Sequence, residues 1–371
     1  SGEFGRSARQ ASSASCKQCL QTIEDLDLID ASDGSEGCEL VLATGEAWAD
    51  HVLGAQKGGA AVAALLLDED SRRYTATHRT LLLIHRWIEA HPARSEPWVA
   101  LGHLLGGDSP FREAARGLGL VRTAVAAVAP PSNLGPQVSA GVLLALGNFL
   151  GCAAARVEAL SCGLLGGLER HVVSGVEEVA SAALVCLANA VAHDRAAKLA
   201  ALHQGLLQAS EGALRRWVDS PPAASAALMA LGNLLDEQEI QREAEGSVGA
   251  AVVECLEYHG RRADGGGDVE YYGFVALGNL FAGCAPSPEI RRRALDLAHA
   301  ALSREHLPEP LCEAVVAGLL ESLHRSAPLS PEWAPMVHSA MGRFPENDRL
   351  KREGGGICDP DLEPMVKRLR V

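Results

Sequence analysis

Aromatic residues are scarce in this chain, and their scarcity limits how a core can be built. They make up 4% of the 371 residues, although the hydrophobic fraction is an ordinary 47%. The core must therefore consist mainly of leucine, alanine and valine, which suit closely packed helices. Apolar and polar residues rarely alternate in the period-two pattern of a half-buried strand. We expect an all-α protein.

Long apolar runs, disulfide frameworks and excess basic charge are also missing. No run of 18 uncharged apolar residues and no signal-peptide core is present, so we expect no membrane span. Ten cysteines in 371 residues are too sparse for a disulfide scaffold and indicate a reducing compartment. We expect a cytoplasmic location, with the nucleus as the alternative. Ser1-Gly2-Glu3-Phe4 resembles a cloning remnant.

The chain has 33 Lys and Arg against 47 Asp and Glu, a formal charge of −14. This balance disfavours nucleic acid, whose binding depends on basic side chains that neutralise phosphates. It favours a basic protein partner, steered by charge. An acidic surface that only keeps the protein dispersed is an equally weighted alternative, and the sequence does not decide the oligomeric state.

Motifs for catalysis, cofactors or metals are weak. Cys16 and Cys19 form a lone CxxC, with Cys38 as the one further thiol nearby, whereas zinc usually requires a second ligand pair. Gly265-Gly266-Gly267 lacks the Gly-Lys-Ser/Thr that follows a phosphate loop. We therefore expect a protein that is not an enzyme, with no catalytic residues, no cofactor and no metal.

One short phrase recurs along the chain at a nearly constant interval. Its last position is occupied by His103 and then by four asparagines, at intervals of 45, 41, 44 and 46 residues. Such a period indicates an array of structural repeats. The full copies are Leu146-Gly147-Asn148, Leu187-Ala188-Asn189, Leu231-Gly232-Asn233 and Leu277-Gly278-Asn279, with Leu101-Gly102-His103 as a fifth.

The same phrase predicts which side of its helix is buried. The residues five before, two before and two after each asparagine share one face of a helix, and all are apolar. The asparagine itself should point away from that stripe, toward solvent or a groove. The small residue before it allows a neighbouring helix to approach. The expected buried residues are Leu143, Leu146, Leu150, Leu184, Leu187, Val191, Leu228, Leu231, Leu235, Phe274, Leu277 and Phe281.

A second landmark lies between the phrases, where an apolar helix ends in glycine before a new apolar run. Gly117, Gly163, Gly205 and Gly246 stand at these places. Glycine tolerates the left-handed backbone that a tight turn between helices requires. Each repeat should therefore contain three helices, and the third should carry the asparagine.

These signals divide the chain into four parts. We expect a disordered N-terminus over residues 1–13 and N-terminal helices or degenerate capping repeats over 14–94, with a helix near 16–29, a loop at 30–37 and a helix near 40–53. Regular repeats should occupy 95–328, with Ser322 in a weak last copy. Residues 329–371 should hold a helix near 333–341 and a flexible tail that includes the glycines at 354–356.

With this period, the glycine turn and the Ala-Leu-Gly-Asn-Leu type of third helix, the chain resembles the armadillo-repeat family, best over Glu158 to Val191. The resemblance covers residues 95–285 well. It implies a right-handed α-solenoid of three-helix repeats whose third helices line a concave groove. It also implies that Asn148, Asn189, Asn233 and Asn279 hydrogen-bond the backbone of a bound segment.

The chain departs from the importin-α-like members of that family, which place tryptophan four residues before the asparagine. Leu144, Val185, Met229 and Val275 stand there instead, so recognition of classical nuclear localisation signals is not expected. The remaining surface of amides and aliphatic side chains suits an extended peptide or a partner helix. We expect a groove formed by His103, the four asparagines, Val185, Met229, Val275 and Tyr271, with burial an equal alternative for Tyr271.

The sequence thus favours a non-enzymatic intracellular scaffold that binds a protein segment. Family members without the tryptophan series include regulators of small GTPases and exchange factors for Hsp70, and such a regulator is the alternative. On this interpretation, replacing two adjacent asparagines with alanine should weaken binding with little effect on thermal unfolding.

Overall fold

A computed structural model describes residues 34–358 except 48, 108, 245 and 261–266. The predicted helix near 16–29 and the CxxC of Cys16 and Cys19 lie outside these residues, as does the N-terminal stretch 1–13. Within the described residues all regular structure is helical. The chain divides into two compact units, Ser1–Gly167 and Leu168–Val371, called unit 1 and unit 2 here.

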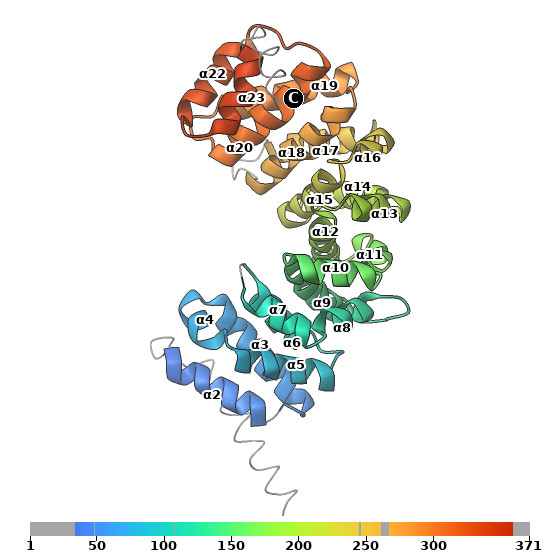
Figure 1. The fold of residues 1–371 in the computed structure, drawn as a ribbon, viewed down its shortest axis with the longest axis vertical. Helices are drawn as coiled ribbons and strands as arrows, with labels where there is room; N and C mark the ends of the chain where they lie inside the picture. The colour runs from blue at the N-terminus through green and yellow to red at the C-terminus, as the bar shows by residue number, and fades with distance from the viewer. Residues whose placement is uncertain (1–33, 48, 108, 245, 261–266, 359–371) are drawn as a thin grey trace, which may run out of the picture. The chain divides into compact units, whose positions relative to one another are not determined.

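Unit 1 is built from consecutive short helices, two of which, α6 and α9, carry the repeated phrase. Helices α3, α6 and α9 pack side by side, α6 lying between the other two (Figure 1). Trp98 of α6 is fully buried and donates its indole N–H to the carbonyl of Pro92. The helices are α2 Gly34–Ala47, α3 Val52–Leu67, α4 Glu69–Thr75, α5 His78–Ala90, α6 Ser95–Leu105, α7 Phe111–Gly117, α8 Leu120–Val128, α9 Pro136–Phe149 and α10 Ala153–Ser161, followed by α11 Leu164–Val172 at the boundary.

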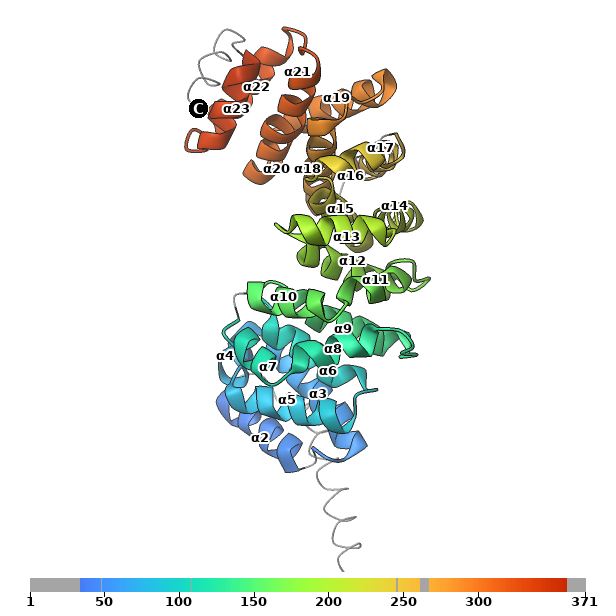
Figure 2. The same cartoon turned by 45° about the vertical axis from the view of Figure 1, so that its right-hand side comes forward.

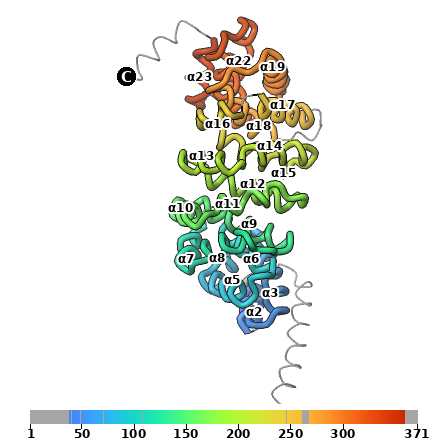
Figure 3. Tube along the Cα trace, turned by 90° about the vertical axis from the view of Figure 1, so that its right-hand side faces the viewer, coloured from blue at the N-terminus to red at the C-terminus, as the bar shows by residue number. Residues whose placement is uncertain are grey.

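Unit 2 repeats the same order of helices. Helices α12, α15 and α18 stack in sequence (Figures 2 and 3). The segment η3, which has the wider turns of a π-helix, packs on α18. Its elements are α12 Glu177–Val191, α13 Arg195–His203, α14 Leu206–Arg216, α15 Pro221–Leu234, α16 Gln238–Glu243, α17 Ser247–Gly260, α18 Gly267–Gly283, α19 Pro288–Leu302, α20 Glu309–Glu313, η3 Ala314–Leu320, α21 Glu321–Ser326, α22 Trp333–Arg343 and α23 Asp348–Cys358.

The predicted core stripe is confirmed. All twelve residues named from the repeated phrase are buried, the most exposed being Phe281 at 4%. Helices α6, α9, α12, α15 and α18 carry the phrase, and we call them, together with α3, the third helices. Apolar burial on one face of each helix is the main stabilising contribution to such a stack.

The glycine turns are confirmed at three of the four predicted places. Gly163, Gly205 and Gly246 have φ values of 83°, 72° and 96°, in the left-handed region that favours glycine. The first prediction was off by two residues, because Gly117 ends α7 and Gly119 carries the positive φ of 78°. Two glycines, Gly117 and Gly119, lie close together here, and only the backbone conformation shows that Gly119 forms the left-handed turn.

Two terminal predictions are wrong. Helix α2 begins at Gly34 and ends at Ala47, so the expected loop at 30–37 and helix near 40–53 are both misplaced. The glycines at 354–356 belong to α23 rather than to a flexible segment. A methyl group on Gly354 would lie 2.9 Å from the Met341 sulfur, so glycine here allows α23 to approach α22.

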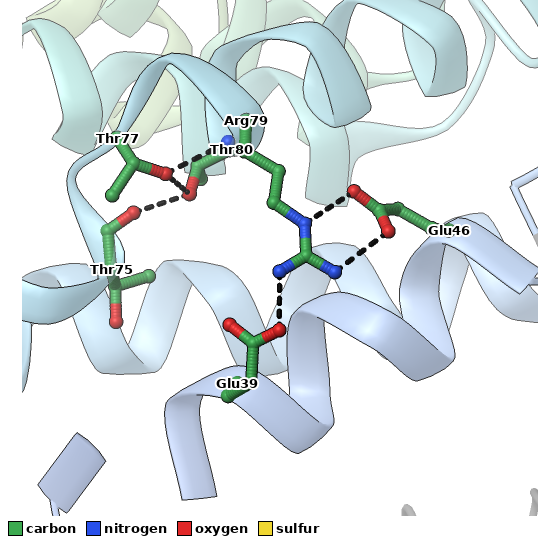
Figure 4. Close-up of polar contacts among 6 residues, drawn as sticks. All are labelled: Glu39, Glu46, Thr75, Thr77, Arg79 and Thr80. Atoms are coloured by element: carbon green, nitrogen blue, oxygen red, sulfur yellow. Dashed lines mark hydrogen bonds and ion pairs between the residues drawn. The ribbon is translucent and has the colours of Figure 1, made fainter. Parts of the chain in front are cut away.

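Helix α2 is joined to α5 by one arginine that contacts two carboxylates (Figure 4). Arg79 Nε and Nη2 donate to Glu46 at 2.6 and 2.8 Å, and Nη1 contacts Glu39 at 2.5 Å. Beside it, the Thr77 and Thr80 hydroxyls lie 2.9 Å apart. The bond from Arg79 holds the pKa of Glu46 below its ordinary value of 4.5.

Acidification should therefore loosen α2 before the rest of unit 1. A lowered carboxyl pKa contributes stability that is present above the unfolded value of 4.5 and is lost as pH falls through the lower folded value. Because Glu46 is 40% exposed, the loss should not exceed about 1 kcal/mol. The protection factors of α2 amides, which are exchange rates corrected for the intrinsic pH dependence of amide exchange, should fall below about pH 4.5 in the wild type. Exchange in Arg79→Ala should already be fast at neutral pH, and an identical pH response in both proteins would contradict the assignment.

Candidate functional site

Each third helix that carries the phrase presents one narrow, partly exposed stripe. The residues eight and four positions before the asparagine, and the asparagine itself, are half-buried, while most of their neighbours on the helix are buried. Spacing of four residues places these side chains on one face. In unit 1 the stripes are Ser95, Val99, His103 and Ala140, Leu144, Asn148; in unit 2 they are Ser181, Val185, Asn189, then Ser225, Met229, Asn233, then Tyr271, Val275, Asn279.

The asparagines are bonded within the fold as well as partly exposed. In unit 1, Asn148 Nδ2 donates to the carbonyl of Gly102 at 2.8 Å. In unit 2, Asn233 Nδ2 donates to Ala188 at 2.9 Å, and Asn279 Nδ2 donates to Gly232 at 2.8 Å. Each acceptor immediately precedes the corresponding position of the preceding repeat. The amides therefore join consecutive third helices.

This bonding changes one expectation drawn from the sequence. An amide has two N–H donors and an acceptor oxygen, so one internal bond leaves one N–H and Oδ1. The side chain is held in place before any partner arrives. Removing it should cost about 0.5–1.5 kcal/mol per residue, because a part-buried carbonyl loses its donor. The expectation that asparagine replacement leaves unfolding nearly unchanged is therefore not supported by the geometry.

His103 occupies the asparagine position of α6, half-buried, and its environment disfavours the charged form. Burial lowers the pKa of its imidazole, and the nearby charge of Arg72 lowers it further. Arg72 Nη2 donates to the carbonyls of His103 and Gly106, at 3.3 and 3.1 Å. At neutral pH this residue thus offers a neutral ring to the surface.

The middle residue of each unit 2 stripe is apolar, and together these residues form what we call the apolar middle row. Val185, Met229 and Val275 are half-buried, each one turn before its asparagine. Ser181, Ser225 and Tyr271 stand one further turn back. The rings of Tyr271 and Tyr272 pack edge to face, with centroids 5.1 Å apart, and both are half-buried. Tyr271 is therefore neither fully exposed in a groove nor fully buried, the two alternatives that the sequence left open.

A pocket of about 350 Å³ adjoins the last stripe of unit 2 and is lined by Tyr271, Val275 and Asn279. It is also lined by Glu309 and Glu313 of α20 and by Asn347 and Arg349. Three residues predicted as groove residues thus line one cavity. We call it the α18–α20 pocket.

The acidic wall of this pocket is held by two neighbouring side chains. Asn347 Nδ2 lies 3.0 Å from Glu309 Oε1 and 3.0 Å from Glu313 Oε2. Arg349 Nη1 contacts Glu313 Oε1 at 2.7 Å. Asn347 Oδ1 accepts the N–H of Leu350 and so caps the start of α23. Sequence reasoning missed all four residues, because they lie outside the repeated phrase and no spacing connects them to it.

The described residues contain no group of three or more His, Cys, Asp and Glu side chains that could hold a metal ion. Cys38 is buried in α2, where its sulfur lies 3.3 Å from the Thr75 hydroxyl. Among the described helices, none is long and apolar enough to cross a bilayer.

Comparison of the sequence with protein-family models and with curated proteins found no match. Solved structures do resemble the fold. An engineered protein aligns with a TM-score of 0.53 at 16% identity, over 90% of this chain and 86% of its own. A structure from work on a phosphorylation switch between cadherin and beta-catenin aligns with a TM-score of 0.57 at 14% identity. That match covers 79% of this chain and 58% of the other.

A designed armadillo repeat protein aligns with a TM-score of 0.49 at 16% identity, over 71% of this chain and 98% of its own. At these identities the comparisons bear on fold alone. The three-helix repeats described above, together with the two matches at TM-scores of 0.53 and 0.57, show that this chain is an all-α solenoid with the armadillo-repeat fold, as the sequence predicted.

Proposed function

We propose that this armadillo-repeat solenoid is a non-enzymatic scaffold that binds a segment of another protein along its third helices. In unit 1 the binding surface would consist of His103 and Asn148. In unit 2 it would be the stripes of α12, α15 and α18, which we call the unit 2 face. The segment is either an extended peptide or a helix.

The observation that carries this proposal is the internal anchoring of the asparagines. Asn233 and Asn279 each use one N–H to bond the preceding helix and keep Oδ1 and a second N–H. A partner then meets side chains that are already ordered, so less conformational entropy is lost on binding. Backbone N–H and C=O groups of a peptide match these donors and acceptors.

The apolar middle row supplies the second part of the argument. Val185, Met229 and Val275 are half-buried and lie beside the amides, so aliphatic side chains of a partner gain apolar contact next to polar anchors. Methionine adapts its shape to varied contacts. The net charge of −14 favours a partner with basic residues.

The test begins with peptides selected for binding to the full chain from a random display library. The variant Val185→Glu/Met229→Glu places charge in the apolar row and leaves the asparagine bonds intact. Binding of a selected peptide should weaken about tenfold or more, while the melting temperature stays close to wild type. Val173→Glu is the matched control, because Val173 is an apolar unit 2 residue, 49% exposed and outside the stripes.

Equal loss in both variants, or none in either, would count against the unit 2 face. Weaker binding at higher salt would support the basic partner, because exposed charges are screened. A nucleotide-exchange assay with labelled small GTPase or Hsp70 addresses the regulator alternative, since a scaffold gives no acceleration.

A further inference from the structure

The α18–α20 pocket lies at the end of the last stripe, and its lining combines three kinds of group. Tyr271 contributes an aromatic ring, Asn279 contributes an amide that is anchored to Gly232, and Glu309 and Glu313 contribute carboxylates. Val275, Pro310 and Ala314 form the apolar part of the lining. We propose that this pocket receives one lysine or arginine side chain of the bound segment.

The charge of the wall supports a cation. Glu309 and Glu313 are one helical turn apart, and like charges at that spacing repel. Arg349 forms its ion pair with Glu313, and no ion pair of Arg349 with Glu309 is found among the described residues. Asn347 binds both carboxylates but carries no charge. Among the described residues Glu309 therefore has no cationic partner. Its carboxylate can accept a second cation.

The other walls suit the rest of such a side chain. The methylene groups of lysine or arginine pack on apolar surface while the charged head reaches polar groups. A cation above an aromatic ring gains further attraction, and Tyr271 offers that ring. Oδ1 of Asn279 adds an acceptor, whereas a carboxylate ligand would face two like charges. The pocket volume of about 350 Å³ is within the range of small-ligand sites.

This inference rests on the proposed function for the identity of the ligand as part of a protein segment, but it can be tested without that segment. The probes are N-acetyl-lysine methylamide, N-acetyl-arginine methylamide and the norleucine analogue, which has the aliphatic chain without the charge. Their binding to the full chain is measured by saturation-transfer NMR. The lysine and arginine probes should bind and compete with each other, and the norleucine probe should not bind.

Three variants separate the pocket from general acidity. Glu309→Gln/Glu313→Gln should weaken the cationic probes about tenfold, the scale of losing one hydrogen bond to a charged group. Arg349→Ala should strengthen them, because it removes the competing cation. Glu332→Gln is the control; it removes one exposed carboxylate of unit 2 away from this pocket.

Equal binding of the norleucine probe, or an unchanged response in Glu309→Gln/Glu313→Gln, would overturn the inference. The opposite direction expected for Arg349→Ala keeps the test decisive even if the double variant folds poorly. Display-selected peptides that need the unit 2 face but show no basic position would leave the scaffold proposal intact and remove this one. If the probes bind as expected but no peptide is selected, the pocket inference stands and the scaffold proposal fails.

Discussion

Replacing Gly278 with alanine should lower the free energy of unfolding of unit 2 by about 1–3 kcal/mol, the usual cost of overpacking a core. A methyl group there would lie 2.8 Å from the carbonyl carbon of Gly318 and 3.1 Å from its oxygen. These are backbone atoms of η3, so no side-chain rotation relieves the contact, and α18 and η3 have to separate. Chemical denaturation of the full chain, followed by a unit 2 probe such as Trp333, measures the change.

Gly232→Ala is the matched control, because Gly232 stands at the same position of the repeated phrase. The nearest atom to a methyl group at Gly232 is Val275 Cγ1 at 3.6 Å, an ordinary contact. Alanine is the better helix former by about 1 kcal/mol, so this variant should be neutral or more stable. Similar destabilisation of both variants would show that the contact with Gly318 is not the reason for glycine at 278.

Removing the arginine of the buried ion pair should give the second large effect. Arg304 donates to Glu270 through Nη1 at 2.6 Å and Nη2 at 2.5 Å, and the Glu270 side chain is 5% exposed. The bonded carboxylate raises the pKa of Arg304. Arg304→Ala should destabilise unit 2 by about 2–3 kcal/mol, because it leaves an uncompensated buried charge. The estimate is below that for a fully buried pair because Arg304 is 36% exposed.

Two further variants identify the cause. Arg292→Ala breaks a surface pair with Asp296, in which both side chains are 68% exposed, and should cost less than about 0.5 kcal/mol. Glu270→Ala/Arg304→Ala removes both charges and should be less destabilising than Arg304→Ala alone. If the double variant is the least stable of the set, packing of the arginine stem rather than charge is the main contribution.

Much of the fold could be predicted because each repeat has the same spacing of apolar residues along its third helix. The apolar residues at Leu228, Leu231 and Leu235 recur in register with those at Leu184, Leu187 and Val191, and helical geometry alone converts that spacing into a buried stripe. Left-handed turns at Gly163 and Gly205 follow equally from local chemistry. The terminal elements escaped prediction because their residues do not share the repeated pattern. Gly354 reads as a breaker, yet packing against Met341 keeps it helical.

The candidate site also has features that the sequence predicted and features that it did not. Spacing predicted that Val185, Met229 and Val275 would share a face beside the asparagines, since it depends only on positions along one helix. It did not predict that Asn233 and Asn279 bond the carbonyls of Ala188 and Gly232, because such bonds depend on the distance between helices.

By itself, the sequence determined the helical class, the repeat period and the buried stripe, since these follow from how residues are spaced along one helix. Only the tertiary structure decided that the amide row also joins neighbouring helices, that Gly278 touches η3 while Gly232 has room, and that Glu309 and Glu313 face Tyr271. Those relations depend on the packing distance and rotation of one helix against another. Both are set by the summed contacts of many side chains and have no local signal in the chain.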